Sequence, residues 1–385
     1  MQTVSPASAR AARRPLGIRA GVPLWTAIGA LIALHSIGDA EATAQRTFVA
    51  SIGNDANPCS LAAPCRSFAA SIAQTNDKGE IVVLDSAGYG NVTITKSVTI
   101  VSPPGIYAGI SVFTGNDGIT VNAPSGVIVL RGLKINGQGG NVGINFVQGA
   151  ELRIERCDIA AMNQFAINAN LAAGASIYIR DTTISGSGTP VGSGIFLTGG
   201  GRVSLERVAI TGSPSVGITI LDGPDAALRH VAVERNDIGI LLQSGFGSTS
   251  VSIDESRIFA NRSDGIRMLT GGSGVLRAAI SDSEIVTNNQ GALAPGGGIV
   301  VQGTSAGTGV AQVTLMRTRS SYNVGAGLLA QYAGVAIHVD RCVVVENTGY
   351  GLAAATGATV YTRGTSTIEN NIGGNLNGVS SYAGK

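Results

Sequence analysis

A repeated pair, glycine followed by isoleucine or leucine, constrains the fold of this 385-residue chain more than any other feature. The spacing between successive pairs varies between 22 and 33 residues, and Ala166-Ile167 fills the one gap in the series. Such irregular spacing excludes a propeller or a leucine-rich horseshoe, and it fits the coils of a solenoid whose turns differ in length. The glycines of the pairs are Gly143, Gly194, Gly217, Gly239, Gly265, Gly298, Gly327 and Gly351.

Short alternating segments precede these pairs, as in Leu152-Arg-Ile154 and Val251-Ser-Ile253. A period of two places the apolar residues on one face of a strand, which we expect to be the inner face. A second short strand follows after a bend, and the next turn often carries asparagine at its third position. We expect these asparagines to stack in successive coils and to bond along the solenoid, a structural role. They are Asn236, Asn261, Asn288, Asn323, Asn347 and Asn371.

These repeats resemble the right-handed parallel β-helix repeats of the pectin-lyase-like superfamily, from about Gly79 to the C-terminus. The resemblance implies an all-β fold, namely a single right-handed parallel β-helix with three short strands per coil and roughly ten coils. We therefore assign residues 79–385 to the β-helix. The 55 glycines and the low content of charged residues, 13%, agree with a chain made of strands and turns.

The first 44 residues read as a secretory signal peptide. Four arginines precede an apolar segment at residues 22–38, and Ala42 and Ala44 provide the small side chains that a signal peptidase needs before Gln45. The apolar segment is short and is followed by acidic residues, so it favours cleavage over a membrane anchor. We predict a secreted or periplasmic protein that has no membrane contact after the signal is removed.

Residues 45–78 are predicted to form an N-terminal cap with a disulfide loop and a short amphipathic helix near residues 67–73. In an exported protein we expect the close pair Cys59 and Cys65 to form the disulfide. Cys157 and Cys342 occupy equivalent inward positions several coils apart, so we expect two buried free thiols.

The charge of the chain argues against a nucleic-acid partner. Four of the 26 basic residues and two of the 24 acidic residues lie in the predicted signal, so the mature chain is formally neutral. A neutral chain lacks the broad basic surface by which nucleic-acid-binding proteins contact phosphates.

Alignment of the coils places outward residues in two charged columns. The first alternates in sign and reads Arg131, Glu155, Arg180, Glu206, Arg229, Asp254, Ser281, Met316 and Asp340. The second reads Arg156, Asp181, Arg207, His230, Glu255, Asp282, Arg317 and Arg341, so Glu255 and Asp282 stack as like charges. Two stacked carboxylates could share a proton as an acid and nucleophile pair, or bind Ca²⁺.

The candidate catalytic residues are therefore Glu255, Asp282, His230 and Arg317, and Glu255 and Asp282 are the candidate Ca²⁺ ligands. No other cofactor is expected. The alternative is structural: both carboxylates belong to a salt-bridge ladder with Arg257 and Arg317.

Two functions remain open at this point. The weak signal for an active site favours a non-catalytic envelope or extracellular protein that contacts a polysaccharide or cell-surface glycan, as an adhesin does. The alternative is a carbohydrate-active enzyme, a polysaccharide lyase, glycoside hydrolase or epimerase, acting on an acidic polysaccharide. The Gly-His-Gly and Trp-Ile-Asp-His motifs of two enzyme families of this fold are absent from the sequence. Exposed aromatic rings often bind sugars, and the candidates are Tyr178, Phe246, Tyr332 and Tyr350.

Overall fold

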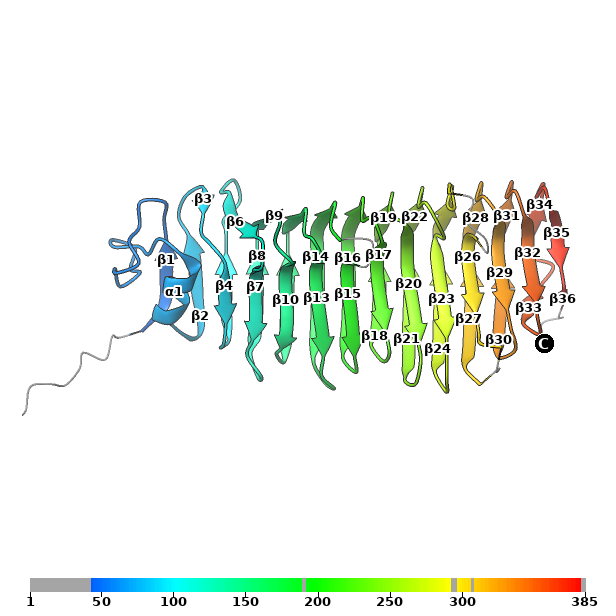
Figure 1. The fold of residues 1–385 in the computed structure, drawn as a ribbon, viewed down its shortest axis with the longest axis horizontal. Coiled ribbons are helices and arrows are strands. Elements are labelled where there is room, and N and C mark those ends of the chain that lie inside the picture. The colour runs from blue at the N-terminus through cyan, green and yellow to red at the C-terminus, as the bar shows by residue number, and fades with distance from the viewer. Residues whose placement is uncertain (1–42, 189–191, 292–295, 306–307, 382–385) are drawn as a thin grey trace, which may run out of the picture. The chain divides into compact units, whose positions relative to one another are not determined.

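The computed structural model describes residues 43–188, 192–291, 296–305 and 308–381, within one compact unit, Thr43–Lys385. The predicted signal peptide lies outside the described residues, apart from Thr43 and Ala44. Within the unit the chain winds through successive coils, so that each strand lies beside its equivalents one coil before and one coil after (Figure 1). The predicted parallel β-helix is confirmed, and the smaller of its two sheets has twelve strands.

Each complete coil contains a long strand, a short strand and a third strand, and all ladder pairs between coils are parallel. The long and short strands share the larger sheet, and two of its strands, β14 and β16, run through the corner between both positions. The long-strand series is β1 (Ala44–Val49), β2 (Thr75–Val83), β5 (Val98–Val101), β8 (Val127–Arg131), β11 (Glu151–Glu155), β14 (Ser176–Ser185), β16 (Arg202–Thr211), β18 (Asp225–Arg229), β21 (Ser248–Asp254), β24 (Val275–Ser281), β27 (Val310–Met316), β30 (Val335–Asp340), β33 (Thr359–Thr362) and β36 (Val379–Ser381).

The other two series follow the same order along the chain. The short strands are β3 (Ala87–Gly88), β6 (Ala108–Phe113), β9 (Leu133–Gln138), β12 (Asp158–Ala160), β19 (Ala232–Glu234), β22 (Arg257–Phe259), β25 (Glu284–Val286), β28 (Arg319–Ser321), β31 (Val343–Val345) and β34 (Thr367–Glu369). The third strands are β4 (Val92–Ile94), β7 (Asp117–Asn122), β10 (Val142–Gln148), β13 (Phe165–Leu171), β15 (Ser193–Gly199), β17 (Val216–Leu221), β20 (Ile238–Ser244), β23 (Ile266–Thr270), β26 (Gly297–Gln302), β29 (Ala326–Gln331), β32 (Tyr350–Ala355) and β35 (Gly374–Asn377).

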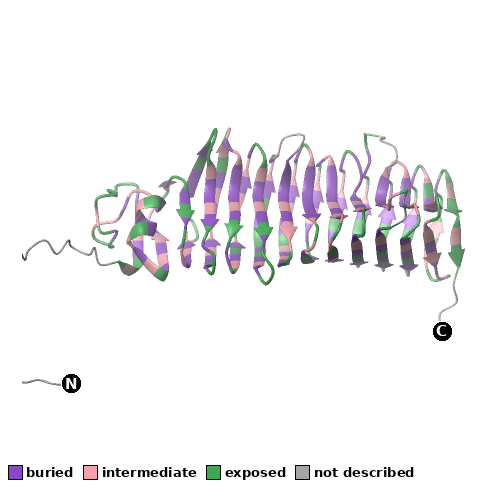
Figure 2. Ribbon diagram, turned by 60° about the horizontal axis from the view of Figure 1, so that its bottom comes forward, coloured by how far each residue is buried: buried purple, intermediate pink, exposed green. Residues whose placement is uncertain are grey.

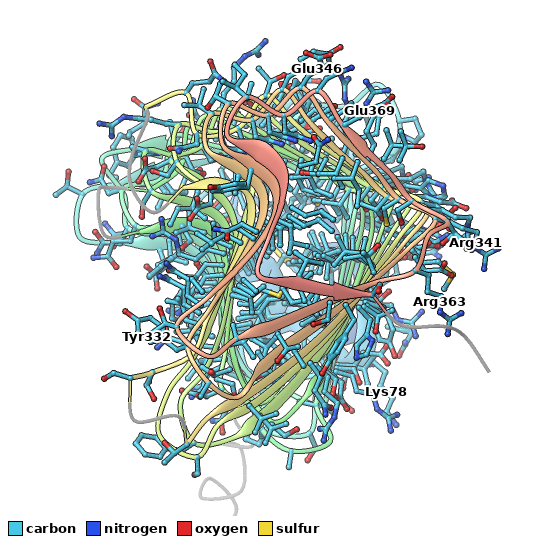
Figure 3. All side chains as sticks on the ribbon, turned by 90° about the vertical axis from the view of Figure 1, so that its right-hand side faces the viewer. Lys78, Tyr332, Arg341, Glu346, Arg363 and Glu369 are labelled. Atoms are coloured by element: carbon cyan, nitrogen blue, oxygen red, sulfur yellow. A yellow bond between two sulfur atoms is a disulfide. The ribbon has the colours of Figure 1, made fainter. Side chains whose placement is uncertain are left out.

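The core is a set of stacks with one aliphatic residue per coil. Ile253 in β21 pairs with Leu228 in β18 and with Ile280 in β24, and all three are buried. Each such side chain stabilises the fold by about 1.5 to 3 kcal/mol on burial. A view along the coils shows the interior filled with side chains, whereas Arg341 and Glu346 lie on the outside (Figure 3). The bands of buried and exposed residues repeat along the strands (Figure 2).

The helix α1 (Phe68–Gln74) confirms the helix expected near residues 67–73. Ser67 caps it, because its side-chain oxygen accepts a hydrogen bond from the N of Ala70 at 3.1 Å. The helix buries Phe68 and Ile72 against the N-terminal strands, and it contacts β1, β2 and β4. Among the described residues α1 is the single α-helix, and it has seven residues. No helix in this part of the chain is long and apolar enough to cross a bilayer.

The parallel sheet begins before residue 79, where we expected the β-helix to start. Strand β1 pairs with β2, so residues predicted as part of a separate cap belong to the first coil. The predicted disulfide between Cys59 and Cys65 is present and buried, with the two Cα atoms 4.6 Å apart. It closes the loop between β1 and α1.

The glycine and asparagine repeats both arise from the close packing of a ladder of asparagine side chains against the start of the third strand. The asparagines are buried, and each one from Asn261 to Asn371 accepts hydrogen bonds from the asparagine of the preceding coil. The first of the series, Asn236, accepts one from the backbone N of Ser213. A Cβ atom on Gly265 would lie 2.8 Å from the Nδ2 of Asn288 and 2.7 Å from the carbonyl oxygen of Gly298. Glycine is required at this position because the asparagine ladder passes directly against the third strand.

Candidate functional site

The second charged column lies at the corner between the long and the short strand. Its eight members share a left-handed backbone with φ between 47° and 52°. Residues other than glycine, asparagine and aspartate adopt this conformation rarely, so the corner itself is a strained position. Every corner side chain points outward, one per coil. The members are Arg156, Asp181, Arg207, His230, Glu255, Asp282, Arg317 and Arg341.

Glu255 is bound to the coil that precedes it. Its carboxylate accepts hydrogen bonds from the Nη2 of Arg229, at 3.3 Å to each oxygen, and forms a close contact with the Nε2 of His230. The expected pairing with Arg257 is wrong, because Arg257 lies on the short strand and pairs with Glu284 at 3.5 Å. All of these side chains are substantially exposed.

Asp282 is bound to the coil that follows it. Arg317 donates from Nε to Oδ1 at 2.7 Å and from Nη2 to Oδ2 at 2.6 Å, which confirms the expected pair. This guanidinium lowers the pKa of Asp282 below its ordinary value. The same two-bond geometry recurs between Arg207 and Asp181 in a different part of the column. A geometry that repeats along the solenoid is typical of a structural ladder.

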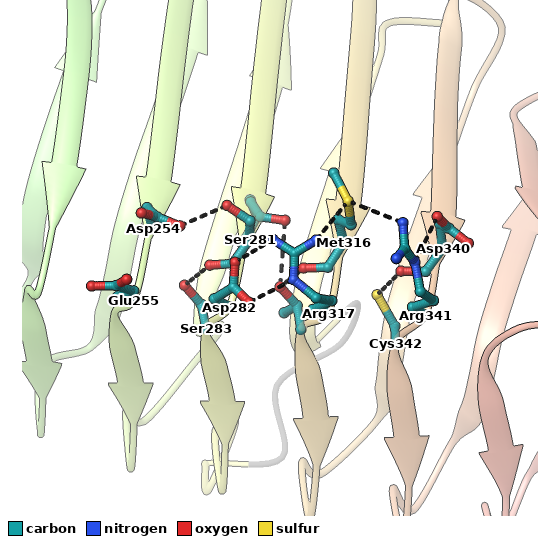
Figure 4. Close-up of polar contacts among 12 residues, drawn as sticks. Asp254, Glu255, Ser281, Asp282, Ser283, Met316, Arg317, Asp340, Arg341 and Cys342 are labelled. Atoms are coloured by element: carbon teal, nitrogen blue, oxygen red, sulfur yellow. Dashed lines mark hydrogen bonds and ion pairs between the residues drawn. The ribbon is translucent and has the colours of Figure 1, made fainter.

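The two central carboxylates of the predicted site therefore turn away from each other (Figure 4). The structure joins Glu255 to Arg229 and His230 in the preceding coil, and Asp282 to Arg317 in the following coil. Among the described residues there is no group of three or more side chains suited to hold a metal ion. Catalytic and Ca²⁺-binding roles for these residues stay predictions.

The first charged column runs along the long strands as predicted. Its register is continuous from Arg131 to Asp340, and opposite charges meet across coils, as in the pair of Arg131 and Glu155 at 2.8 Å. Such exposed pairs contribute about 0.2 to 1 kcal/mol each. Beside this column, two residues nearer the start of each long strand, lies a surface that the charge pattern does not reveal.

That surface is a shallow groove of about 710 Å³ on the outer face of the long strands. One outward residue from each of five successive coils forms its floor, and all five are small. They are Ser204, Ala227, Ser252, Ala279 and Thr314. The floor combines methyl groups with hydroxyl groups, which suits a ligand that has both an apolar face and hydrogen-bonding groups.

Larger rings stand at both ends of this column. Tyr178 precedes Ser204, and the guanidinium of Arg153 lies 5.3 Å from its ring centre. His338 follows Thr314 and stacks on Tyr361, with ring centres 5.1 Å apart. Six coil steps separate Tyr178 from His338, a length of about 29 Å at 4.8 Å per step.

One side of the groove carries basic, acidic and uncharged polar residues. They are Arg202, Asp225, Ser250, Arg277 and Gln312, again one per coil. Sequence reasoning identified Tyr178 as an outward ring but missed the groove. The sequence feature that could have revealed the groove is the run of small residues in the aligned outward column. This column has neither charged residues nor a recognisable motif.

One buried carboxylate also escaped the sequence reasoning. Asp264 is fully buried in the turn before β23, and burial raises its pKa. Its oxygens accept hydrogen bonds from the Nε of Arg267 at 2.5 Å and from the N of Gly297 at 3.0 Å. These bonds hold the start of β26 against the neighbouring coil, so the role of Asp264 is structural.

Comparisons with known proteins agree with the fold. Residues 117–278 match the family model of the right-handed β-helix region. The crystal structure of the periplasmic alginate epimerase AlgG superposes with a TM-score of 0.52 at 12% sequence identity, over 79% of this chain and 77% of that chain. For pectate lyase Pel9A the TM-score is 0.38 at 16% identity, over 89% of this chain and 78% of that chain.

No curated protein matches the sequence as a relative. The sequence identity to these solved structures is too low for their activities to be assigned to this chain, so the likeness concerns the fold alone. The likeness to AlgG agrees with the β-helix fold that the glycine, isoleucine and asparagine repeats predict. The described chain therefore folds as a parallel β-helix, and residues 117–278 of it match the right-handed β-helix family model.

Proposed function

We propose that this protein is an extracytoplasmic, non-catalytic β-helix protein that binds a linear polysaccharide or cell-surface glycan along the groove between Tyr178 and His338. The observation that carries the proposal is the groove itself, with its floor of small residues and Tyr178 in its lining. His338 lies one coil step beyond Thr314, at the other end of the same outward column. A sugar ring offers an apolar face and hydroxyl groups, and both find matching groups here.

The dimensions of the groove support an extended ligand. Its floor contributes one residue every 4.8 Å or so, which is close to the length of one sugar unit in a linear chain. A polysaccharide lying along the coils would therefore meet a similar set of groups at each unit. The buried disulfide of Cys59 and Cys65 supports an oxidising, extracytoplasmic location.

The absence of convergent acid and base groups favours binding over catalysis. Among the described residues that line the groove, Asp225 is the one carboxylate. The predicted catalytic residues Glu255 and Asp282 lie outside that lining, at the corner, each in an ion pair. The fold of a periplasmic alginate epimerase, which acts on a polysaccharide, keeps the enzymatic alternative worth testing.

The test uses the purified exported protein with sodium alginate, polygalacturonate and a neutral β-glucan, each with and without Ca²⁺. Binding is measured by isothermal titration calorimetry for the wild type and for Ala279→Trp, which fills the floor. We expect at least one polymer to bind the wild type and its affinity to fall about tenfold or more in the variant, because the indole occupies the space of a sugar ring.

Ala232→Trp is the matched control, since Ala232 is outward on the short strand and is replaced by Arg257 in the next coil. It should bind as the wild type does. Equal affinity in wild type and Ala279→Trp would overturn the groove as the binding site. Polymer cleavage or a change in sugar configuration during the incubation would support the enzyme instead.

A further inference from the structure

Met316 breaks the first charged column. It lies on the outer face of β27 between Ser281 and Asp340, at a place where most other coils have a charged residue. Its side chain is partly exposed. The other methionines of the described chain, Met162 and Met268, are buried in the core.

Two arginines point at the sulfur of Met316 (Figure 4). The Nη1 of Arg317 lies 3.0 Å from the Sδ atom, and the Nη2 of Arg341 lies 3.9 Å from it. Each guanidinium also binds a carboxylate, that of Asp282 or Asp340. A thioether sulfur is a weak hydrogen-bond acceptor. The two guanidinium groups are strong donors, so their hydrogen bonds to this sulfur are weaker than those they could form with an oxygen.

We propose that Met316 is a reversible oxidation site for a peroxide, and that Arg317 and Arg341 bind the oxygen of its sulfoxide. A sulfur lone pair attacks one oxygen of hydrogen peroxide, and the sulfur–oxygen bond forms as the oxygen–oxygen bond breaks. The sulfur loses two electrons to the peroxide, and the second oxygen leaves as water once it has taken up the remaining proton. In the reverse step a thiol-dependent sulfoxide reductase returns the sulfoxide to methionine: two thiols supply two electrons and two protons and become a disulfide, and the sulfoxide oxygen leaves as water.

The surroundings of Met316 suit the product better than the reactant. A sulfoxide oxygen is a strong, polar acceptor, and a hydrogen bond to a charged donor is stronger than one between neutral groups. Oxidation of a core methionine places a polar group among apolar ones and disrupts the fold. At Met316 the new oxygen joins a column of polar residues, so oxidation leaves the fold intact and strengthens the contact between coils.

The test exposes the purified protein to dilute hydrogen peroxide and follows oxygen uptake by mass spectrometry of its peptides. We expect Met316 to gain one oxygen atom at least about tenfold faster than Met162 and Met268, because they are shielded from solvent. The oxidised protein should melt about 1 to 2 °C higher than the reduced one. Equal rates at the three methionines, or a lower melting temperature after oxidation, would overturn the proposal.

Three variants separate sulfoxide binding from a general effect of the oxidant. Met316→Leu should show no oxidation-dependent shift in melting temperature. Arg341→Ala should reduce the shift, because one of the two donors is lost, whereas Arg156→Ala, at the same corner position in a coil remote from Met316, should keep it in full. The same shift in Arg341→Ala as in the wild type would contradict the assigned role of the arginines.

Discussion

The Oδ1 atom of Asn288 accepts two hydrogen bonds from Asn261 in the preceding coil, one from its backbone N at 3.2 Å and one from its Nδ2 at 2.9 Å. Both residues are fully buried. Asn288→Ala would leave these donors without a partner, so we expect a loss of about 2 to 4 kcal/mol in the free energy of unfolding. Denaturant unfolding followed by circular dichroism measures it. Asn170→Ala, at an exposed asparagine, should change stability by less than about 0.5 kcal/mol.

Gly265→Ala tests the close passage between the third strand and the asparagine ladder. The new Cβ would overlap the carbonyl oxygen of Gly298 and the Nδ2 of Asn288. We expect a loss of about 1 to 3 kcal/mol, since the coils must separate locally. Gly364→Ala is the control, because no atom lies within 4 Å of its Cβ position. A similar stability for both variants would show that the ladder does not require glycine.

The thiols of Cys157 and Cys342 should be unreactive in the native protein. Both are buried, and burial raises the pKa of Cys157 to about 11 and also raises that of Cys342. The reactive thiolate is therefore scarce at neutral pH. Titration with a thiol reagent should detect no free thiol before unfolding and two afterwards without reductant. Four thiols in the unfolded, unreduced protein would contradict the disulfide.

The corner carboxylates are tested together by Glu255→Gln with Asp282→Asn. If the column is a structural ladder, the double variant should melt slightly below the wild type, because ion pairs with Arg229 and Arg317 are lost. Its response to Ca²⁺ should equal that of the wild type. A Ca²⁺-dependent rise in melting temperature that is present in the wild type and absent from the variant would instead establish the predicted metal site.

Acid should weaken the N-terminal coil through Asp85. Hydrogen bonds from the side-chain hydroxyl groups of Ser51 and Tyr89 to its carboxylate lower the pKa of Asp85. A lowered pKa means that the ionised carboxylate stabilises the fold above about pH 4 and that this stability is lost as the pH falls through the lowered value. Asp85→Asn should melt lower than the wild type at pH 7 and show a smaller further loss between pH 5 and pH 3. The same dependence of melting temperature on pH in Asp85→Asn as in the wild type would show that Asp85 does not cause the loss of stability in acid.

The fold was predictable because the coils interact mainly with their neighbours. Any constraint on one coil, such as a glycine beside an asparagine ladder, recurs in the next and becomes visible as a repeat. Gly265 and Asn288 illustrate this, since each is required by the other. The start of the sheet was placed too late, because β1 precedes a loop with no repeat signal and joins the sheet only by pairing with β2.

The site was less predictable for two physical reasons. Alignment gave the corner column its members, but the partner of each charge depends on side-chain direction: Glu255 turns to Arg229 in one coil and Asp282 to Arg317 in the other. The left-handed backbone of Glu255 was also hidden, because neither glycine nor asparagine marks it. The groove arises from small side chains such as Ala279, and a missing side chain leaves no chemical signature in a sequence.

The one-residue-per-coil register of the groove has a consequence for how its length can change. Residues 225–249 span one register repeat, since Asp225 pairs with Ser250. Removing them would bring Ser250 to the place of Asp225 and leave the outward column in phase, with one floor position fewer. The distance between Tyr178 and His338 would then shorten by a single strand spacing, about 4.8 Å. The length of the groove is thus adjustable in whole coil steps by insertion or deletion of coils, without redesign of any individual contact.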